Sequence, residues 1–171
     1  ADGNDFVPMV PELVAPDWPA ARFVFPHASR RPVTINGGMS MRAWYDITGM
    51  EIAQRQDETG IRNSIKQIEA LIARELERGI PSSHIILAGF SQGAAMSISA
   101  GLRHTERLAG IIALSGYLPL ERQLETEQSV ANADVPIFIG HGSLDPVVPQ
   151  TLGMLCRNLL RAHGYKVVWN S

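Results

Sequence analysis

Short apolar runs alternate along the chain with segments in which apolar residues recur every three or four positions. The helical spacing is clearest over 61–76, and Gly79 and Pro81 follow as helix-ending residues. Further helices are predicted at 92–102, which is rich in small residues, and at 151–164. Apolar runs typical of buried strands lie at 21–26, 84–90, 109–116, 135–142 and 165–170.

This alternation of strands and helices predicts an α/β fold with a mostly parallel sheet. The strand runs are continuously apolar, which is typical of strands that helices cover on both faces. The segment 30–47 is rich in proline and glycine and too irregular for either period, so we expect a loop there. The 171 residues suit one domain spanning 1–171, because no linker or repeat divides them.

Charge and composition argue against two classes of function, nucleic-acid binding and insertion into a membrane. The formal net charge of −2 gives no electrostatic footprint for nucleic acid or for an anionic membrane. The apolar runs are far shorter than the roughly 20 residues of a membrane helix, so no integral membrane segment is expected. The single cysteine, Cys156, cannot form an internal disulfide, which permits a reducing compartment, and we expect a cytoplasmic protein. The oligomeric state stays open, with a homodimer as one alternative.

One serine stands between two glycines in the stretch GFSQG, residues 89–93, where an apolar run meets a run of small residues. A sharp strand-to-helix turn would strain the backbone of Ser91 and expose its hydroxyl. A Cβ two residues before or after the serine would collide with the turn, which favours glycine at both places. The Gln92 N–H, at the start of the helix, could then hold an oxyanion. We predict a nucleophile elbow at Ser91, with an ordinary glycine-rich turn as the alternative.

Four motifs, ADGNDF, RAWYDI, GFSQGA and HGSLDPVVP in that order, resemble the bacterial carboxylesterase/acyl-protein thioesterase family of α/β-hydrolases. The resemblance covers nearly the whole chain and implies the α/β-hydrolase fold. It also implies a serine carboxylesterase that hydrolyses short to medium acyl esters through an acyl-enzyme intermediate, with a small-molecule ester as substrate. Some members of the family cleave thioesters or lysophospholipids, so those activities are alternatives. The family needs no metal or cofactor.

The partners of the serine follow it in this fold in the order acid, then histidine. Asp145 follows the run at 135–142, and the family motif carries the acid there, although Asp-Pro is also a common turn initiator. The family's histidine lies in a short loop after the last strand, and this sequence ends at Ser171 short of such a loop. His163 comes after Asp145, but its place at a helix end before Gly164 favours a helix-terminal role.

We therefore expect a longer working chain, with N-terminal strand structure and a second oxyanion donor before Ala1. The catalytic histidine and the C-terminal helix of the fold are expected after Ser171. If the chain is complete as given, the alternative is a non-catalytic α/β-hydrolase-like protein that binds acylated ligands. By resemblance, Trp44 and Tyr45 lie beside the acyl groove and are candidate substrate-binding residues. The alternative is that these aromatic residues fasten a loop to the core. Cys156 fits a small buried hydrophobe better than a nucleophile.

Overall fold

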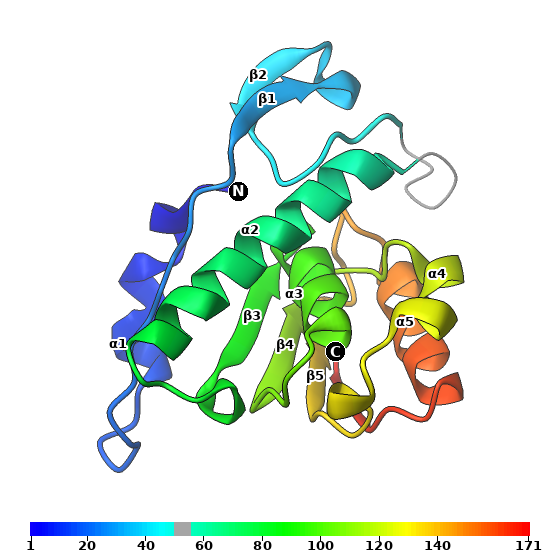
Figure 1. The fold of residues 1–171 in the computed structure, drawn as a ribbon. Coiled ribbons are helices and arrows are strands. Elements are labelled where there is room, and N and C mark those ends of the chain that lie inside the picture. The colour runs from blue at the N-terminus through cyan, green and yellow to red at the C-terminus, as the bar shows by residue number, and fades with distance from the viewer. Residues whose placement is uncertain (50–55) are drawn as a thin grey trace.

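A computed structural model describes residues 1–49 and 56–171. Four parallel strands form the central sheet in the order β3-β4-β5-β6 (Figure 1). The strands are β3 Ile86–Phe90, β4 Gly110–Leu114, β5 Ile137–Gly140 and β6 Val167–Asn170. Each strand lies within a run that the sequence predicted as a strand, and helices connect them. The α/β class is therefore confirmed.

Two helices, α3 (Gln92–Arg103) and α5 (Gln150–Ala162), share one core with the strands. That core includes Ala94, Ile98, Leu102, Ile111, Ala113, Ile137, Ile139, Cys156, Leu160 and Val167. Cys156 is buried there as a small apolar residue, as predicted, and burial raises the pKa of its thiol to about 12. A thiol with so high a pKa stays protonated at neutral pH and is a poor nucleophile.

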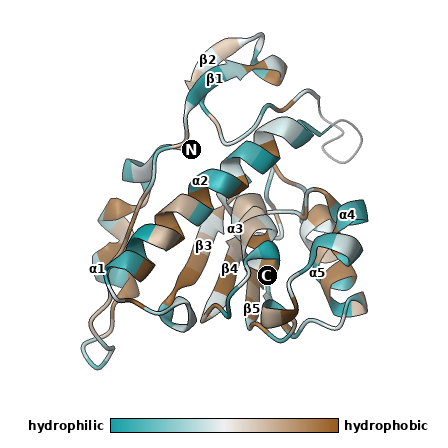
Figure 2. Cartoon of the chain, viewed as in Figure 1, coloured by the Kyte–Doolittle hydropathy of each residue, from teal (hydrophilic) through white to brown (hydrophobic). Residues whose placement is uncertain are grey.

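A longer helix, α2 (Glu58–Glu77), packs against α3 (Figure 1). Figure 2 shows both teal and brown residues along α2, as expected of a helix with one buried side. Ile61 is fully buried in a second core, which joins α2 to α3 and to the loop that contains Trp44. Within the described part of the chain, none of the helices combines the length and the apolarity needed to cross a membrane.

The other face of the sheet also carries apolar side chains. Those at least a third exposed on this face are Ile86, Phe90, Leu114, Phe138 and Val168. The N-terminal segment reaches this face at Phe90, because the ring centroid of Phe6 lies 5.9 Å from that of Phe90. Both faces of the strands are therefore apolar, and Figure 2 shows β3 largely brown. Among the described residues, the helical cover expected from the sequence is seen on the face of Ile111, Ile137 and Val167, where α3 and α5 pack.

The first part of the chain differs from the prediction. Residues 21–26 form no strand, because no neighbouring strand among the described residues pairs with them. The segment expected to be an irregular loop contains an antiparallel hairpin, β1 (Arg30–Val33) with β2 (Met39–Arg42). Gly37 and Gly38 in its turn have φ angles of 65° and 76°, which glycine adopts readily. The Asn-Gly-Gly sequence at 36–38 is typical of such hairpin turns and could have predicted this one. The short helical segments are η1 Gly3–Asp5, η2 Val7–Met9, α1 Val10–Leu13, η3 Thr34–Asn36, η4 Ser82–His84 and η5 Val130–Asn132.

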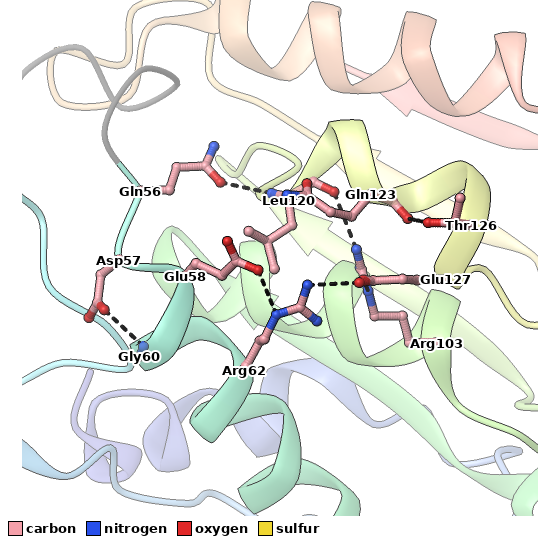
Figure 3. A network of polar contacts seen from close by, with 10 residues as sticks. All are labelled: Gln56, Asp57, Glu58, Gly60, Arg62, Arg103, Leu120, Gln123, Thr126 and Glu127. Carbon is pink, nitrogen blue, oxygen red and sulfur yellow. Dashed lines mark hydrogen bonds and ion pairs between the residues drawn. The ribbon is translucent and has the colours of Figure 1, made fainter.

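A polar network ties α2 and α3 to α4 (Glu121–Glu127), as Figure 3 shows. The Glu127 carboxylate accepts from Arg62 of α2 and from Arg103 of α3, each at an N–O distance of 2.7 Å. The side chain of Arg103 is only 9% exposed, and the Glu127 carboxylate compensates its buried positive charge. Hydrogen bonds from Arg62 and Arg103 hold the pKa of Glu127 below its usual value.

We expect Glu127→Gln to lower the free energy of unfolding at neutral pH by about 2 kcal/mol, because two charge-assisted hydrogen bonds are weakened. The folded pKa of Glu127 lies below its ordinary value of 4.5, so this stabilisation is fully present above that pH. It is lost as the pH falls through the lower, folded pKa. Urea unfolding of both proteins over a pH series measures the effect. A difference between them that does not shrink in acid would contradict the assignment.

Candidate active site

Ser91 occupies the sharp turn between β3 and α3. It has φ 55° and ψ −119°, in the left-handed half of backbone space that side chains other than glycine rarely adopt. Its N–H donates to the Leu114 carbonyl at 2.8 Å, which fixes the turn to the end of β4. Its Oγ makes no hydrogen bond to any described residue. The strained serine turn predicted from the sequence is present.

The two glycines of the motif have different roles. A Cβ at Gly89 would lie 2.2 Å from the carbonyl carbon and oxygen of Gly93, so only glycine fits at position 89. A Cβ at Gly93 would meet no atom within 4 Å. The prediction of a collision at both positions is therefore half wrong. The backbone of Gly93 is the surface against which Gly89 packs, and the missing Gly93 side chain would point into open space.

The start of α3 supplies hydrogen-bond donors next to Ser91. Ala95 donates to the Ser91 carbonyl at 3.1 Å, and the N–H groups of Gln92, Gly93 and Ala94 have no acceptor among the described residues. Free N–H groups and the helix dipole favour negative charge at a helix N-terminus. The Gln92 N–H is the donor nearest to Ser91 along the chain, in the place expected for an oxyanion donor.

Asp145 lies in the loop after β5, at the same edge of the parallel sheet as Ser91. Its Oδ1 accepts from the N–H groups of Val147 and Val148, both at 2.9 Å. These two hydrogen bonds hold the pKa of the carboxyl below its usual value, so it is ionised at neutral pH. Its Oδ2 lies 3.9 Å from His141 Nε2, which is too far for a hydrogen bond. Asp145 thus shapes the turn and keeps a negative charge at this edge.

No histidine among the described residues is hydrogen-bonded to Ser91. His141 is buried, and its Nε2 donates to the Val148 carbonyl at 2.8 Å. A Cβ at Gly153 would lie 2.2 Å from His141 Nδ1, so α5 packs directly on this ring. His163 is the C-terminal cap residue of α5, the helix-terminal role that the sequence predicted. Of the others, His27 pairs with Asp2, His104 with Glu69, and His84 ends η4 at the amino edge of the sheet.

A serine–histidine–carboxylate chain does occur, but away from the turn. Ser82 Oγ lies 3.0 Å from His104 Nε2, and His104 Nδ1 lies 2.8 Å from a carboxylate oxygen of Glu69. Ser82 and His104 are each 4% exposed, so a substrate has no access to this serine. This set of hydrogen bonds joins η4, the end of α3 and the middle of α2. Its geometry resembles a catalytic triad, yet its burial fits a structural hydrogen-bond network.

Trp44 and Tyr45 are buried, at 7% and 3% exposure, in the core that contains Met96 of α3. The Tyr45 hydroxyl is hydrogen-bonded to that of Tyr117. Burial raises the pKa of Tyr117 to about 12 and that of Tyr45 well above its usual value, so both hydroxyls stay neutral. This packing supports the alternative in which the aromatic residues fasten the loop to the core. Contact of Trp44 and Tyr45 with a substrate stays a prediction.

Two features of the site were missed in the sequence. The Gln92 side chain is hydrogen-bonded to the backbone of Trp44 and Tyr45, which lie 48 and 47 positions away in the chain. No local sequence pattern marks so distant a contact. Ser115 follows β4 directly and has φ 49°, and a hydrogen bond from its side chain contributes to the lowered pKa of Asp145. A polar residue directly after a buried strand was the signal that could have identified Ser115.

The described residues show no metal site, and two of their cavities can be judged by size and position. An open hollow of about 480 Å³ lies at the amino ends of the strands, where Ile86, Gly110 and Lys166 line it. Ligand sites of parallel sheets lie at the carboxyl ends, so we assign this hollow no part in chemistry at Ser91. A cavity of about 10 Å³ beside Tyr45 and Tyr117 is too small for a ligand. No three His, Cys, Asp or Glu side chains in residues 1–49 and 56–171 cluster as metal ligands.

Solved structures resemble this fold over nearly its whole length. SOBER1 of Arabidopsis thaliana is 25% identical and has a TM-score of 0.93, and the alignment covers 99% of this chain and 82% of that one. Esterase PE8 is 28% identical with a TM-score of 0.79, over 100% of this chain and 77% of that one. These likenesses identify the α/β-hydrolase fold, and Ser91 lies at the turn from β3 to α3 of that fold.

Curated relatives share more sequence. Acyl-protein thioesterase 1 of Neurospora crassa is 42% identical over 153 residues, which are 85% of this chain and 62% of the relative. Acyl-protein thioesterase 1 of Schizosaccharomyces pombe is 44% identical over 131 residues, 77% of this chain and 58% of the relative. The chain thus spans about three fifths of the length of these relatives. The model of the phospholipase/carboxylesterase family matches residues 11–170, and the chain therefore belongs to that family of α/β-hydrolases.

Proposed function

We propose that this protein hydrolyses carboxylic esters through an acyl-enzyme intermediate on Ser91. One observation carries the proposal: a serine in a strained turn, with no hydrogen bond on its Oγ among the described residues, beside free N–H groups at the start of α3. Strained residues of this kind cluster at functional sites of proteins. Membership of the phospholipase/carboxylesterase family supports a hydrolase, and short to medium acyl esters are the proposed substrates.

In the proposed reaction, Ser91 Oγ attacks the carbonyl carbon of the ester while a histidine takes the hydroxyl proton. The Gln92 N–H donates to the oxygen that becomes negative in the tetrahedral intermediate. The histidine then gives its proton to the departing alcohol, and the acyl group stays on Ser91. Water, activated by the same histidine, releases the acid. Asp145 orients the imidazole and stabilises its positive form, and it does not take the proton itself.

The mechanism requires a histidine within reach of both Ser91 and Asp145. His27, His104 and His141 contact other groups, His163 lies at the C-terminal end of α5, and His84 lies at the amino edge of the sheet. We therefore propose that a further histidine, in addition to these five, acts as the base. We also propose a second oxyanion donor that acts together with the Gln92 N–H. A protein without such a base would be a binding protein for acylated ligands instead of an enzyme.

Labelling with a fluorophosphonate probe tests the proposal, because only an activated serine reacts quickly with it. We expect one adduct per chain, placed on Ser91 by fragment-ion sequencing of the modified peptide. Ser82 lies in the same tryptic peptide and provides an internal control, since its burial predicts no reaction. Heat-unfolded protein should not react. An adduct on Ser82, or no adduct in native protein, would contradict the assignment, and the latter result would favour the binding protein.

The names of the relatives support thioesters as a second substrate class, because both are acyl-protein thioesterases. The same serine and oxyanion donor serve either ester, since both reactions pass through a tetrahedral oxyanion. The ratio of kcat/KM for a p-nitrophenyl ester and for a thioester of the same acyl chain separates the two classes.

A further inference from the structure

The side chain of Gln92 makes two hydrogen bonds to one distant loop. The Trp44 N–H donates to Gln92 Oε1 at 3.0 Å, and Gln92 Nε2 donates to the Tyr45 carbonyl at 2.9 Å. One amide group therefore satisfies a donor and an acceptor of two successive residues. Both bonds have ordinary lengths for N–H to oxygen contacts. Gln92 thus fastens the first residue of α3 to the loop at Trp44 and Tyr45.

Only a primary amide of this length satisfies both partners. A carboxylate has acceptors only, so in place of Nε2 it would set an oxygen against the Tyr45 carbonyl oxygen. A hydrocarbon side chain would leave the Trp44 N–H and the Tyr45 carbonyl without their partners in a partly buried place. The two contacts therefore specify glutamine at position 92, independently of any role for its backbone.

The loop that Gln92 holds is itself well anchored. The Ser64 hydroxyl of α2 donates to the Trp44 carbonyl, and the Tyr45 hydroxyl bonds to that of Tyr117. Trp44 and Tyr45 are both buried in the core shared with α2 and α3. Gln92 is consequently tied to a rigid part of the molecule, not to a mobile surface loop.

The direction of the Gln92 N–H depends on the turn before it. That peptide group is oriented by the backbone angles of Ser91, φ 55° and ψ −119°, which are strained. Strained angles persist only where the surroundings determine them from several sides. The contact of Gly89 with Gly93 and the bond from Ser91 N–H to Leu114 constrain one side of the turn. The two hydrogen bonds of the Gln92 side chain add a further constraint, on the residue that follows Ser91.

We infer that the side chain of Gln92 is a positioning residue for the reaction: it holds the Gln92 N–H in the direction needed by the oxyanion. The inference rests on the proposed function of Ser91, and it assigns to the Gln92 side chain a task separate from that of its N–H. A misdirected donor weakens stabilisation of the transition state more than binding of the ester. Loss of the side-chain bonds should therefore lower kcat and leave KM nearly unchanged.

The test compares Gln92→Met, which keeps the size of the side chain and removes both bonds, with wild type. For p-nitrophenyl butyrate we expect kcat to fall by about 10-fold to 100-fold, less than for loss of an oxyanion donor outright, with KM within about twofold. Gln92→Glu, which turns a donor toward Tyr45 into an acceptor, should lower kcat at least as much. Ser64→Ala is the matched control, because it removes a hydrogen bond to Trp44 from α2 and should leave kcat unchanged.

Backbone ¹⁵N relaxation provides a second measurement that needs no turnover. We expect the amide of residue 92 to be rigid in wild type and in Ser64→Ala, with an order parameter of about 0.85, and clearly lower in Gln92→Met. An unchanged kcat together with a rigid amide in Gln92→Met overturns the inference. A parallel loss of kcat in Ser64→Ala overturns it too, because it would show only general loosening of the loop. Hydrolysis that survives in Ser91→Ala overturns the proposed function instead, so the two failures are distinguishable.

Discussion

Ser91→Ala is expected to lower kcat for hydrolysis of a p-nitrophenyl ester by at least about 10³-fold. The residue that forms the acyl-enzyme is removed, and the oxyanion donors that remain provide only a small residual rate. Folding should change little, since Ser91 Oγ makes no hydrogen bond to the described residues. Alanine would occupy the same left-handed backbone as serine, so the variant would gain no relief from strain. Steady-state kinetics and thermal unfolding of the same preparations measure both effects.

Ser82→Ala is the matched control for this experiment. It removes the Ser82 hydroxyl, which lies 3.0 Å from His104 Nε2 in the buried hydrogen-bond network away from the Ser91 turn. We expect this variant to keep its activity and to lose about 1–2 kcal/mol of stability, because a buried hydrogen bond is broken. The reverse pattern, an active Ser91→Ala and an inactive Ser82→Ala, would place the nucleophile at Ser82 and contradict the proposal for Ser91.

Gly89→Ala is expected to have the second large effect, on stability. Its Cβ would lie 2.2 Å from the backbone of Gly93 and 2.6 Å from the Ala94 nitrogen, where no flexible side chain can move aside. Overpacking against rigid backbone should cost about 3 kcal/mol, which corresponds to a fall in Tm of roughly 6–12 °C in a chain of this size. Thermal unfolding followed by circular dichroism measures the change.

Gly93→Ala is the control, because the same substitution four residues away meets no atom within 4 Å. Alanine is more favourable than glycine inside a helix by up to about 1 kcal/mol, so this variant should be as stable as wild type or slightly more stable. Equal losses of stability in the two variants would show that the close approach at Gly89 does not exist in the protein.

Much of the fold could be read from apolar patterning. The runs around Ile86, Ile111, Ile137 and Val167 became the four strands of the parallel sheet, because a continuous apolar run of this length is stable chiefly as a buried strand. The spacing from Ile61 to Leu76 became α2. The prediction of a strand at 21–26 was wrong, because a strand needs a neighbouring strand to pair with and the sequence pattern alone does not show whether one is present.

The sequence by itself determined the strained turn at Ser91 and the need for glycine at position 89, because both follow from local backbone geometry. It also indicated Cys156 as an inert core residue and His163 as a helix end. These features depend on neighbours within a few positions, so local spacing carries the information.

Tertiary structure alone decided which distant groups meet. It brings the side-chain amide of Gln92 into hydrogen bonds with the backbone of Trp44 and Tyr45. It also brings Ser82, His104 and Glu69 together in a buried hydrogen-bond network that resembles a triad. Such contacts join residues tens of positions apart and depend on how helices pack on the sheet. Their energies come from matched donors, acceptors and volumes, which have no signature in the spacing of residues along one chain.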